Sequence, residues 1–184
     1  MRKILGFCAL LLWGVNAYAD LYKVSDTGEV FQRGEQTFAC VLDDQTQLLW
    51  EVKTTKPGLQ NTRNTYTWFD GKTGVENGDF SHHCHWGKSC NTQAYLQALN
   101  QQNLCEKDNW RLPTEKELKT LLVYGDNDLL IDQVFFPNTQ LKSYWSASEI
   151  DTQVAIDVPF FYGGVKSSDK SFDAHIRAVS TLSR

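Results

Sequence analysis

One strand-to-helix junction constrains the fold of this chain more than any other part of its sequence. Residues 109–118 read Asn-Trp-Arg-Leu-Pro-Thr-Glu-Lys-Glu-Leu. Pro113 favours an extended backbone ahead of it, and Thr114 with Glu117 three residues later has the pattern of a capping box, in which each side chain accepts a hydrogen bond from the other residue's backbone amide. The junction therefore predicts a helix that begins at Thr114 and an extended segment that fixes Trp110 just before it.

The first nineteen residues have the pattern of a secretory signal peptide. Two basic residues precede an apolar core over 4–15, and Ala17-Tyr18-Ala19 is a small-x-small cleavage site. The core is shorter than the roughly 18 apolar residues of a membrane span, and no later segment reaches that length. We therefore expect a signal peptide over 1–19 and a mature chain that begins at Asp20 and is exported without a membrane span.

The mature chain is acidic and has the length of a single domain. Of the 184 residues, 165 follow the signal peptide, and these carry 16 lysines and arginines against 22 acidic residues. This balance argues against nucleic-acid binding, which requires a basic face. We interpret residues 20–37 as an N-terminal hairpin or arm and residues 38–184 as one domain with its own core.

Four cysteines follow the signal peptide. An even number of cysteines in an exported chain indicates two disulfides, and four cysteines allow three pairings. We favour Cys84–Cys90, which closes a short loop, together with Cys40–Cys105, which ties an early strand to the junction.

The remaining patterns predict an α+β fold. Two helices are expected, one over 92–102 capped by Asn91 and one from Thr114 to near Gly125. Strand patterns occupy 38–42, 48–52, 65–69, 144–148, 154–158 and 174–179. Residues 71–90 show neither period and are expected to form a long loop. The resulting architecture has two helices packed on a mostly antiparallel, disulfide-stapled sheet.

Several short motifs follow one another in a characteristic order. They are Leu48-Leu49-Trp50, Ala94-Tyr95-Leu96, Trp110-Arg111-Leu112-Pro113-Thr114, Tyr144-Trp145-Ser146-Ala147-Ser148 and Ile176-Arg177-Ala178-Val179. Over residues 40–179 this order resembles the Lcl C-terminal-like domain family, named after a bacterial collagen-like adhesin. The Arg-Leu-Pro-Thr junction is also similar to that of the sulfatase-modifying factor family, whose fold is similar to C-type lectins.

The resemblance implies an exported adhesin-like or ligand-binding module with a C-type-lectin-like fold. In the founding adhesin such a domain binds sulfated polysaccharides. The chain lacks the collagen-like Gly-x-y tract of that adhesin, which leaves both a monomer and a homo-oligomer open. It also has no cysteine after Cys105, so the late cysteine pair that carries the sulfatase-modifying chemistry has no counterpart.

The densest cluster of reactive side chains lies in the long loop, where His82-His83-Cys84-His85-Trp86 is followed by Cys90. Imidazole and thiolate ligands at this spacing suit zinc. In an exported chain, however, the two cysteines oxidise, and a bonded sulfur is a poor zinc ligand, so we expect a disulfide-closed surface loop and no metal. His85 and Trp86 are candidate ligand-binding residues; the alternative is that Trp86 packs over the disulfide.

A second candidate site gathers cations from the last third of the chain: Lys142, Lys166, Lys170 and His175. Together they would form a patch that binds sulfate or carboxylate groups. Because Asp169 and Asp173 are interleaved with them, the alternative is an ordinary solvated surface.

Two arginines and several residues near them are better explained by the scaffold than by a ligand site. Arg111 and Arg177 lie inside apolar patterns, where an ion pair or bonds to carbonyl groups are expected. The residues that we assign to the scaffold are Trp110, Arg111, Pro113, Thr114, Glu117, Trp145 and Arg177.

The sequence shows no nucleophile with a neighbouring base and no phosphate-binding glycine loop, so we expect no enzymatic activity and no cofactor. The leading hypothesis is an envelope domain that binds an acidic or sulfated polysaccharide. The alternative is a periplasmic or surface assembly factor that binds an envelope protein, such as a pilus or secretion component.

Overall fold

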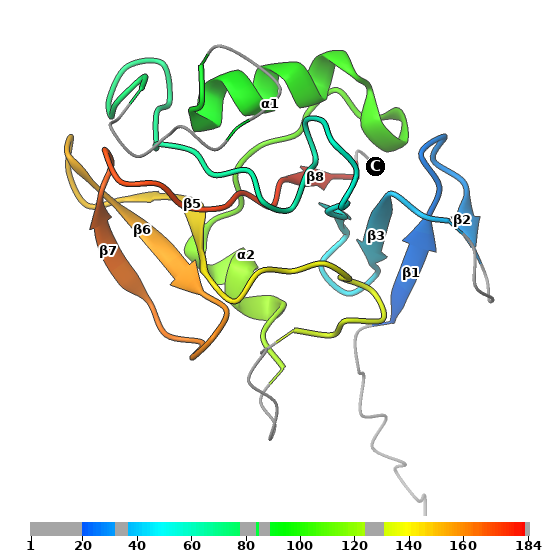
Figure 1. Ribbon diagram of the computed structural model, residues 1–184. Helices are drawn as coiled ribbons and strands as arrows, with labels where there is room; N and C mark the ends of the chain where they lie inside the picture. The colour runs from blue at the N-terminus through cyan, green and yellow to red at the C-terminus, as the bar shows by residue number, and fades with distance from the viewer. Residues whose placement is uncertain (1–19, 32–36, 78–83, 85–88, 124–130, 183–184) are drawn as a thin grey trace, which may run out of the picture.

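The structure is a computed structural model that describes residues 20–31, 37–77, 84, 89–123 and 131–182. Figure 1 shows two small sheets on opposite sides of the molecule, with helix α1 (Thr92–Gln101) lying across the top of both. Helix α2 (Glu115–Thr120) contacts the second sheet, and a short 3-10 turn, η1 (Leu104–Glu106), lies between the two helices in the chain. The predicted α+β class, with two helices on antiparallel sheets, is confirmed.

The first sheet contains five antiparallel strands in the order β2-β1-β3-β4-β8. Their bounds are Leu21–Val24 for β1, Val30–Phe31 for β2, Cys40–Asp43 for β3, Leu48–Glu51 for β4 and Val179–Thr181 for β8. Because β1 pairs with β3 along its full length, the N-terminal hairpin extends the sheet of the main domain.

The second sheet contains three antiparallel strands in the order β5-β6-β7. These are Ser143–Glu149, Val154–Pro159 and Lys166–Asp169. The register between β5 and β6 shifts after Trp145, so the far end of β5 is irregular. Such a shift bends a strand, and it lies next to the face described below as the candidate site.

The buried core residues form two clusters, and β4 contributes to both. Alternate residues of one strand point to opposite faces. On β4, Leu49 therefore joins the cluster that contains Tyr95 of α1, whereas Trp50 joins the cluster that contains Leu118 of α2. This arrangement explains why all four residues of β4 are buried, a pattern that an amphipathic edge strand would not show.

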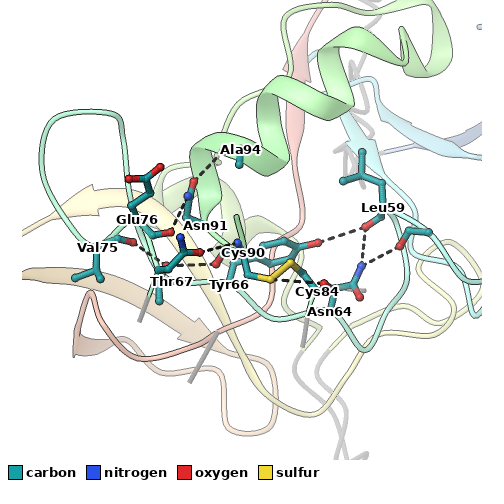
Figure 2. The surroundings of a disulfide bond; sticks show 12 residues. Leu59, Asn64, Tyr66, Thr67, Val75, Glu76, Cys84, Cys90, Asn91 and Ala94 are labelled. Atoms are coloured by element: carbon teal, nitrogen blue, oxygen red, sulfur yellow. Dashed lines mark hydrogen bonds between the residues drawn. A yellow bond between two sulfur atoms is a disulfide. The ribbon is translucent and has the colours of Figure 1, made fainter. Parts of the chain in front are cut away.

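The structure pairs Cys84 with Cys90 and Cys40 with Cys105, as predicted. Figure 2 shows how the first of these disulfides is held. Asn91, the residue after Cys90, accepts a hydrogen bond from the amide of Ala94 as the N-cap of α1 and donates one to the carbonyl of Glu76. The disulfide therefore adjoins the start of α1, which anchors the end of the long loop.

One predicted strand forms only isolated bridges, a second is regular only at its last residue, and the second helix is shorter than expected. Segment 65–69 pairs with a different partner at each step, Tyr66 with Ala174 and Thr67 with Asn91, so no regular ladder develops. Of the predicted strand 174–179, only its last residue lies in regular β8. Helix α2 ends at Thr120 and not near Gly125, because Leu122 leaves the helix to form a bridge with Ile131.

Candidate functional site

A hollow of about 670 Å³ lies against one face of the second sheet. Its floor comes from all three strands, and segment 172–175 together with Thr65 forms another side. Volumes of this size are typical of pockets that bind small molecules. Among the features of the described residues, this hollow is the clearest candidate for a ligand site.

Strand register determines which side chains reach the hollow. Asp157 of β6 is paired with Trp145 of β5 on one side and with Lys166 of β7 on the other. Directly paired residues point to the same face of a sheet, and so do residues two positions apart in one strand. Ser143 and Ser168 therefore line the hollow beside Trp145 and Lys166.

Three of the four cations that the sequence suggested as a patch line this hollow: Lys142, Lys166 and His175. Both lysines are exposed, whereas His175 is buried, with 8% of its surface accessible. Asp157 and Asp173 line the same hollow. The site therefore combines exposed ammonium groups with carboxylates, and it is not a uniformly basic surface.

Lys170 is a correction to the expected patch, because its side chain is completely buried. Its Nζ donates to Glu149 Oε2 over 2.6 Å and to the carbonyl of Asp151 over 2.9 Å. The same ammonium group lies 4.1 Å from the ring centroid of Trp68. Lys170 therefore fastens segment 149–151 to the interior and is unavailable to a ligand in solution.

His175 is held in its neutral form by its surroundings. Burial lowers the pKa of His175 from its ordinary 6.5 to about 4, which outweighs the opposite effect of its hydrogen bond to the Asn64 carbonyl. A carbonyl oxygen only accepts, so the bond of 3.1 Å places the ring proton on Nδ1. At neutral pH, His175 therefore contributes a polar, uncharged wall to the hollow.

This shift predicts that the protein loses stability in mildly acidic solution. The folded pKa lies below the unfolded one, so the contribution of neutral His175 is complete above about pH 6.5 and is lost as the pH falls towards 4. Between pH 7.5 and 5, we expect the free energy of unfolding to fall by about 2 kcal/mol through this residue. Urea denaturation at both pH values measures this change, and we expect the free energy of unfolding of His175→Gln to fall less between pH 7.5 and 5 than that of the wild type. An equal fall in the two proteins would contradict the assignment to His175.

Two aromatic residues that sequence analysis missed stand at the hollow. Phe161 and Phe172 line it, and each keeps 49% of its surface exposed. Phe161 follows β6 at the tip of the β6–β7 hairpin, just before Gly163, whose φ of 69° allows the chain to turn. The run Phe160-Phe161-Tyr162-Gly163-Gly164 does suggest a hairpin tip, but only the structure separates buried Phe160 from exposed Phe161.

Comparison with protein families decides the identity of this scaffold. The profile of the Lcl C-terminal domain matches residues 39–180, which is most of the chain. The chain belongs to the Lcl C-terminal domain family. A comparison with curated proteins finds no match.

In this Lcl C-terminal domain, the junction predicted from sequence connects the start of α2 to strands of both sheets. Thr114 and Glu117 form the capping box, and the Arg111 guanidinium donates to both oxygens of Glu117 over 2.7 and 2.8 Å. This hydrogen bonding lowers the pKa of the Glu117 carboxyl. The amide of Arg111 bonds to Val179 of β8, while the carbonyl of Pro113 accepts from Ala147 of β5.

The other residues assigned to the scaffold are buried. Trp110 donates from Nε1 to the carbonyl of Leu104, and Trp145 donates to the carbonyl of Tyr66. The guanidinium of Arg177, which has no accessible surface, donates to the carbonyl of Glu51 and to Thr139 Oγ1 over 2.8 and 2.7 Å. These contacts leave the three side chains inside the Lcl C-terminal domain, away from solvent.

The candidate loop residues His85 and Trp86 lie outside the described residues, as do His82 and His83. Within the described part of the chain, no group of three or more His, Cys, Asp or Glu side chains is placed to hold a metal ion. No helix in that part has the length and apolar character needed to cross a membrane.

Proposed function

We propose that this Lcl C-terminal domain is an exported, non-enzymatic module that binds an acidic or sulfated polysaccharide at the cell envelope. The observation that carries the proposal is the hollow, in which exposed Lys142 and Lys166 accompany exposed Phe161 and Phe172. Ammonium groups bind sulfate and carboxylate groups, and aromatic faces pack against the C–H faces of sugar rings. A charged sugar presents both features to one pocket.

The disulfides support export and argue against an oxidase activity. The disulfides use all four cysteines that follow the signal-peptide pattern, and such bonds persist in the periplasm or outside the cell. No thiol of the mature chain is then left for an oxidase reaction of the sulfatase-modifying type. The resemblance of the Arg-Leu-Pro-Thr junction further supports a C-type-lectin-like fold, which positions ligands through loops on a rigid scaffold.

Heparin affinity chromatography tests the proposal. We expect retention of the wild-type domain at low salt, and an affinity about tenfold lower for Lys142→Ala/Lys166→Ala, because two exposed ion pairs contribute up to about 1 kcal/mol each. The matched control is Lys56→Ala/Lys72→Ala, which removes the same charge from exposed positions outside the hollow. Equal losses in the two double variants would show that only net charge matters and would count against the hollow.

The second candidate function is a periplasmic or surface assembly factor that binds an envelope protein, such as a pilus or secretion component. The exposed apolar side chains of Phe161, Tyr162 and Val165 at the β6–β7 tip favour it, because clustered apolar surface is typical of protein contacts. Co-purification of one envelope protein in a fixed ratio, without retention on heparin, would support this function over the first.

A further inference from the structure

A buried carboxylate in the hollow has an oxygen without a partner. Asp157 lies on the central strand of the second sheet, and only 1% of its surface is accessible. Its Oδ1 is buried and makes no hydrogen bond with the described residues. Other aspartates of the domain behave differently: Asp43 accepts from the amides of Gln45 and Thr46, and Asp70 accepts from those of Lys72 and Thr73.

A buried carboxylate loses its hydrogen bonds to water and normally replaces them with hydrogen bonds from donors in the protein. An unpartnered oxygen on a buried aspartate is therefore unusual. Lys166 is a cross-strand partner of Asp157 and carries a donor, but it is exposed and leaves Oδ1 without a hydrogen bond. A second oxygen at the hollow, Thr65 Oγ1, is also buried without a partner. Two polar atoms of one pocket therefore lack the donors that a bound ligand could supply.

We infer that Asp157 selects the ligand by accepting hydrogen bonds from hydroxyl groups of a sugar ring, with Thr65 as a second polar contact. The inference rests on the proposed function and gives its ligand a specific chemistry. The anionic substituent of the sugar binds Lys142 and Lys166, and its ring packs against Phe161 and Phe172. A simple polyanion satisfies only the lysines and is repelled by Asp157, so the carboxylate favours charged sugars over other anions.

Whether Asp157→Asn strengthens or weakens ligand binding distinguishes this role from a purely electrostatic effect of the carboxylate. Asp157→Asn keeps the size of the side chain and removes a negative charge beside two lysines. If charge alone governed binding, the variant would bind every polyanion more tightly. If Asp157 accepts sugar hydroxyls, the variant binds a sugar polyanion more weakly, because bonds to a charged acceptor are stronger than those to an amide.

The experiment compares two probes by isothermal titration: a heparin oligosaccharide, which carries free ring hydroxyls, and polyvinyl sulfate, which has sulfate groups but no sugar rings. For Asp157→Asn, we expect Kd for heparin to rise about tenfold or more, while Kd for polyvinyl sulfate stays equal or falls. Thr65→Val should weaken heparin binding in the same direction. Asp108→Asn, which removes a charge at an exposed position outside the hollow, should change neither Kd by more than about twofold.

Several outcomes would overturn the inference, and they differ in what they say about the proposed function. If Asp157→Asn binds heparin as tightly as the wild type or more tightly, while Lys142→Ala/Lys166→Ala loses binding, the polysaccharide function stands and the role of Asp157 falls. If the wild-type domain does not bind heparin, both fall. Thermal unfolding of each variant establishes that it is folded, and Thr65→Val supplies an independent answer if Asp157→Asn is not.

Discussion

Replacement of Glu51 by alanine is expected to lower the free energy of unfolding by about 3–5 kcal/mol, because it leaves a buried cation without its counter-charge. Glu51 has no accessible surface, and its Oε1 accepts from Lys53 Nζ over 2.8 Å and from the hydroxyl of Tyr95. Its Oε2 accepts from the amide of Ala178 over 3.0 Å. One carboxylate thus joins β4, α1 and the segment that enters β8.

The other hydrogen-bond acceptor of Lys53 Nζ is the uncharged hydroxyl of Tyr95, at 2.8 Å. Burial lowers the pKa of Lys53, although the Glu51 carboxylate acts in the opposite direction. Burial, together with the same carboxylate, raises the pKa of Tyr95 well above its ordinary value. Loss of Glu51 therefore leaves the buried Lys53 ammonium without its counter-charge and the Ala178 amide without the carboxylate oxygen that accepts its hydrogen bond.

Chemical denaturation measures the free energy of unfolding of Glu51→Ala, and a double variant that removes both charges is the control. Glu51→Leu/Lys53→Met removes both charges together and retains apolar volume, so it should lose about 2 kcal/mol less than Glu51→Ala. A loss below about 1 kcal/mol for the single variant would show that water reaches Lys53 and would contradict its burial.

Removal of the Cys40–Cys105 disulfide is expected to lower the free energy of unfolding by about 4 kcal/mol, measured on Cys40→Ala/Cys105→Ala. The bond links residues that are 65 positions apart in the chain, and it therefore restricts the unfolded chain over a long loop. Both cysteines belong to the core cluster on the α1 side. The amide of Cys105 also donates to the carbonyl of Asp26, which connects the same point to the β1–β2 hairpin.

The second disulfide is the matched control, because it differs mainly in loop length. Cys84 and Cys90 are six positions apart, so Cys84→Ala/Cys90→Ala should lose only about 2 kcal/mol. Guanidinium denaturation of the two double variants measures the difference. Equal losses would indicate that the effect comes from native contacts and not from restriction of the unfolded chain.

Sequence patterns were sufficient for features that depend on neighbours in the chain. The capping box at Thr114 and the N-cap at Asn91 each need contacts only three residues away, and both occur as predicted. The hairpin of β3 and β4 also follows from two apolar runs around a short polar turn. The disulfide pairing could be predicted for a different reason, since four cysteines allow only three pairings.

The irregular strand pairing of two segments could not be predicted from sequence patterns. The runs 65–69 and 174–179 have strand-like composition, yet each contacts a changing series of partners and forms isolated bridges. Composition reports that a segment is extended and half-buried; it does not report whether one partner accompanies it over several residues.

The candidate site shows most clearly which features follow from sequence and which follow only from the tertiary structure. The sequence by itself determined the family scaffold, the local caps and a set of four cations in the last third of the chain. Only the tertiary structure decided that Lys142, Lys166 and His175 meet in one hollow and that Lys170 is buried elsewhere. The physical reason is strand register: it places Lys166 beside Asp157, whereas β7 ends at Asp169 and the following turn directs Lys170 towards Glu149 and Trp68.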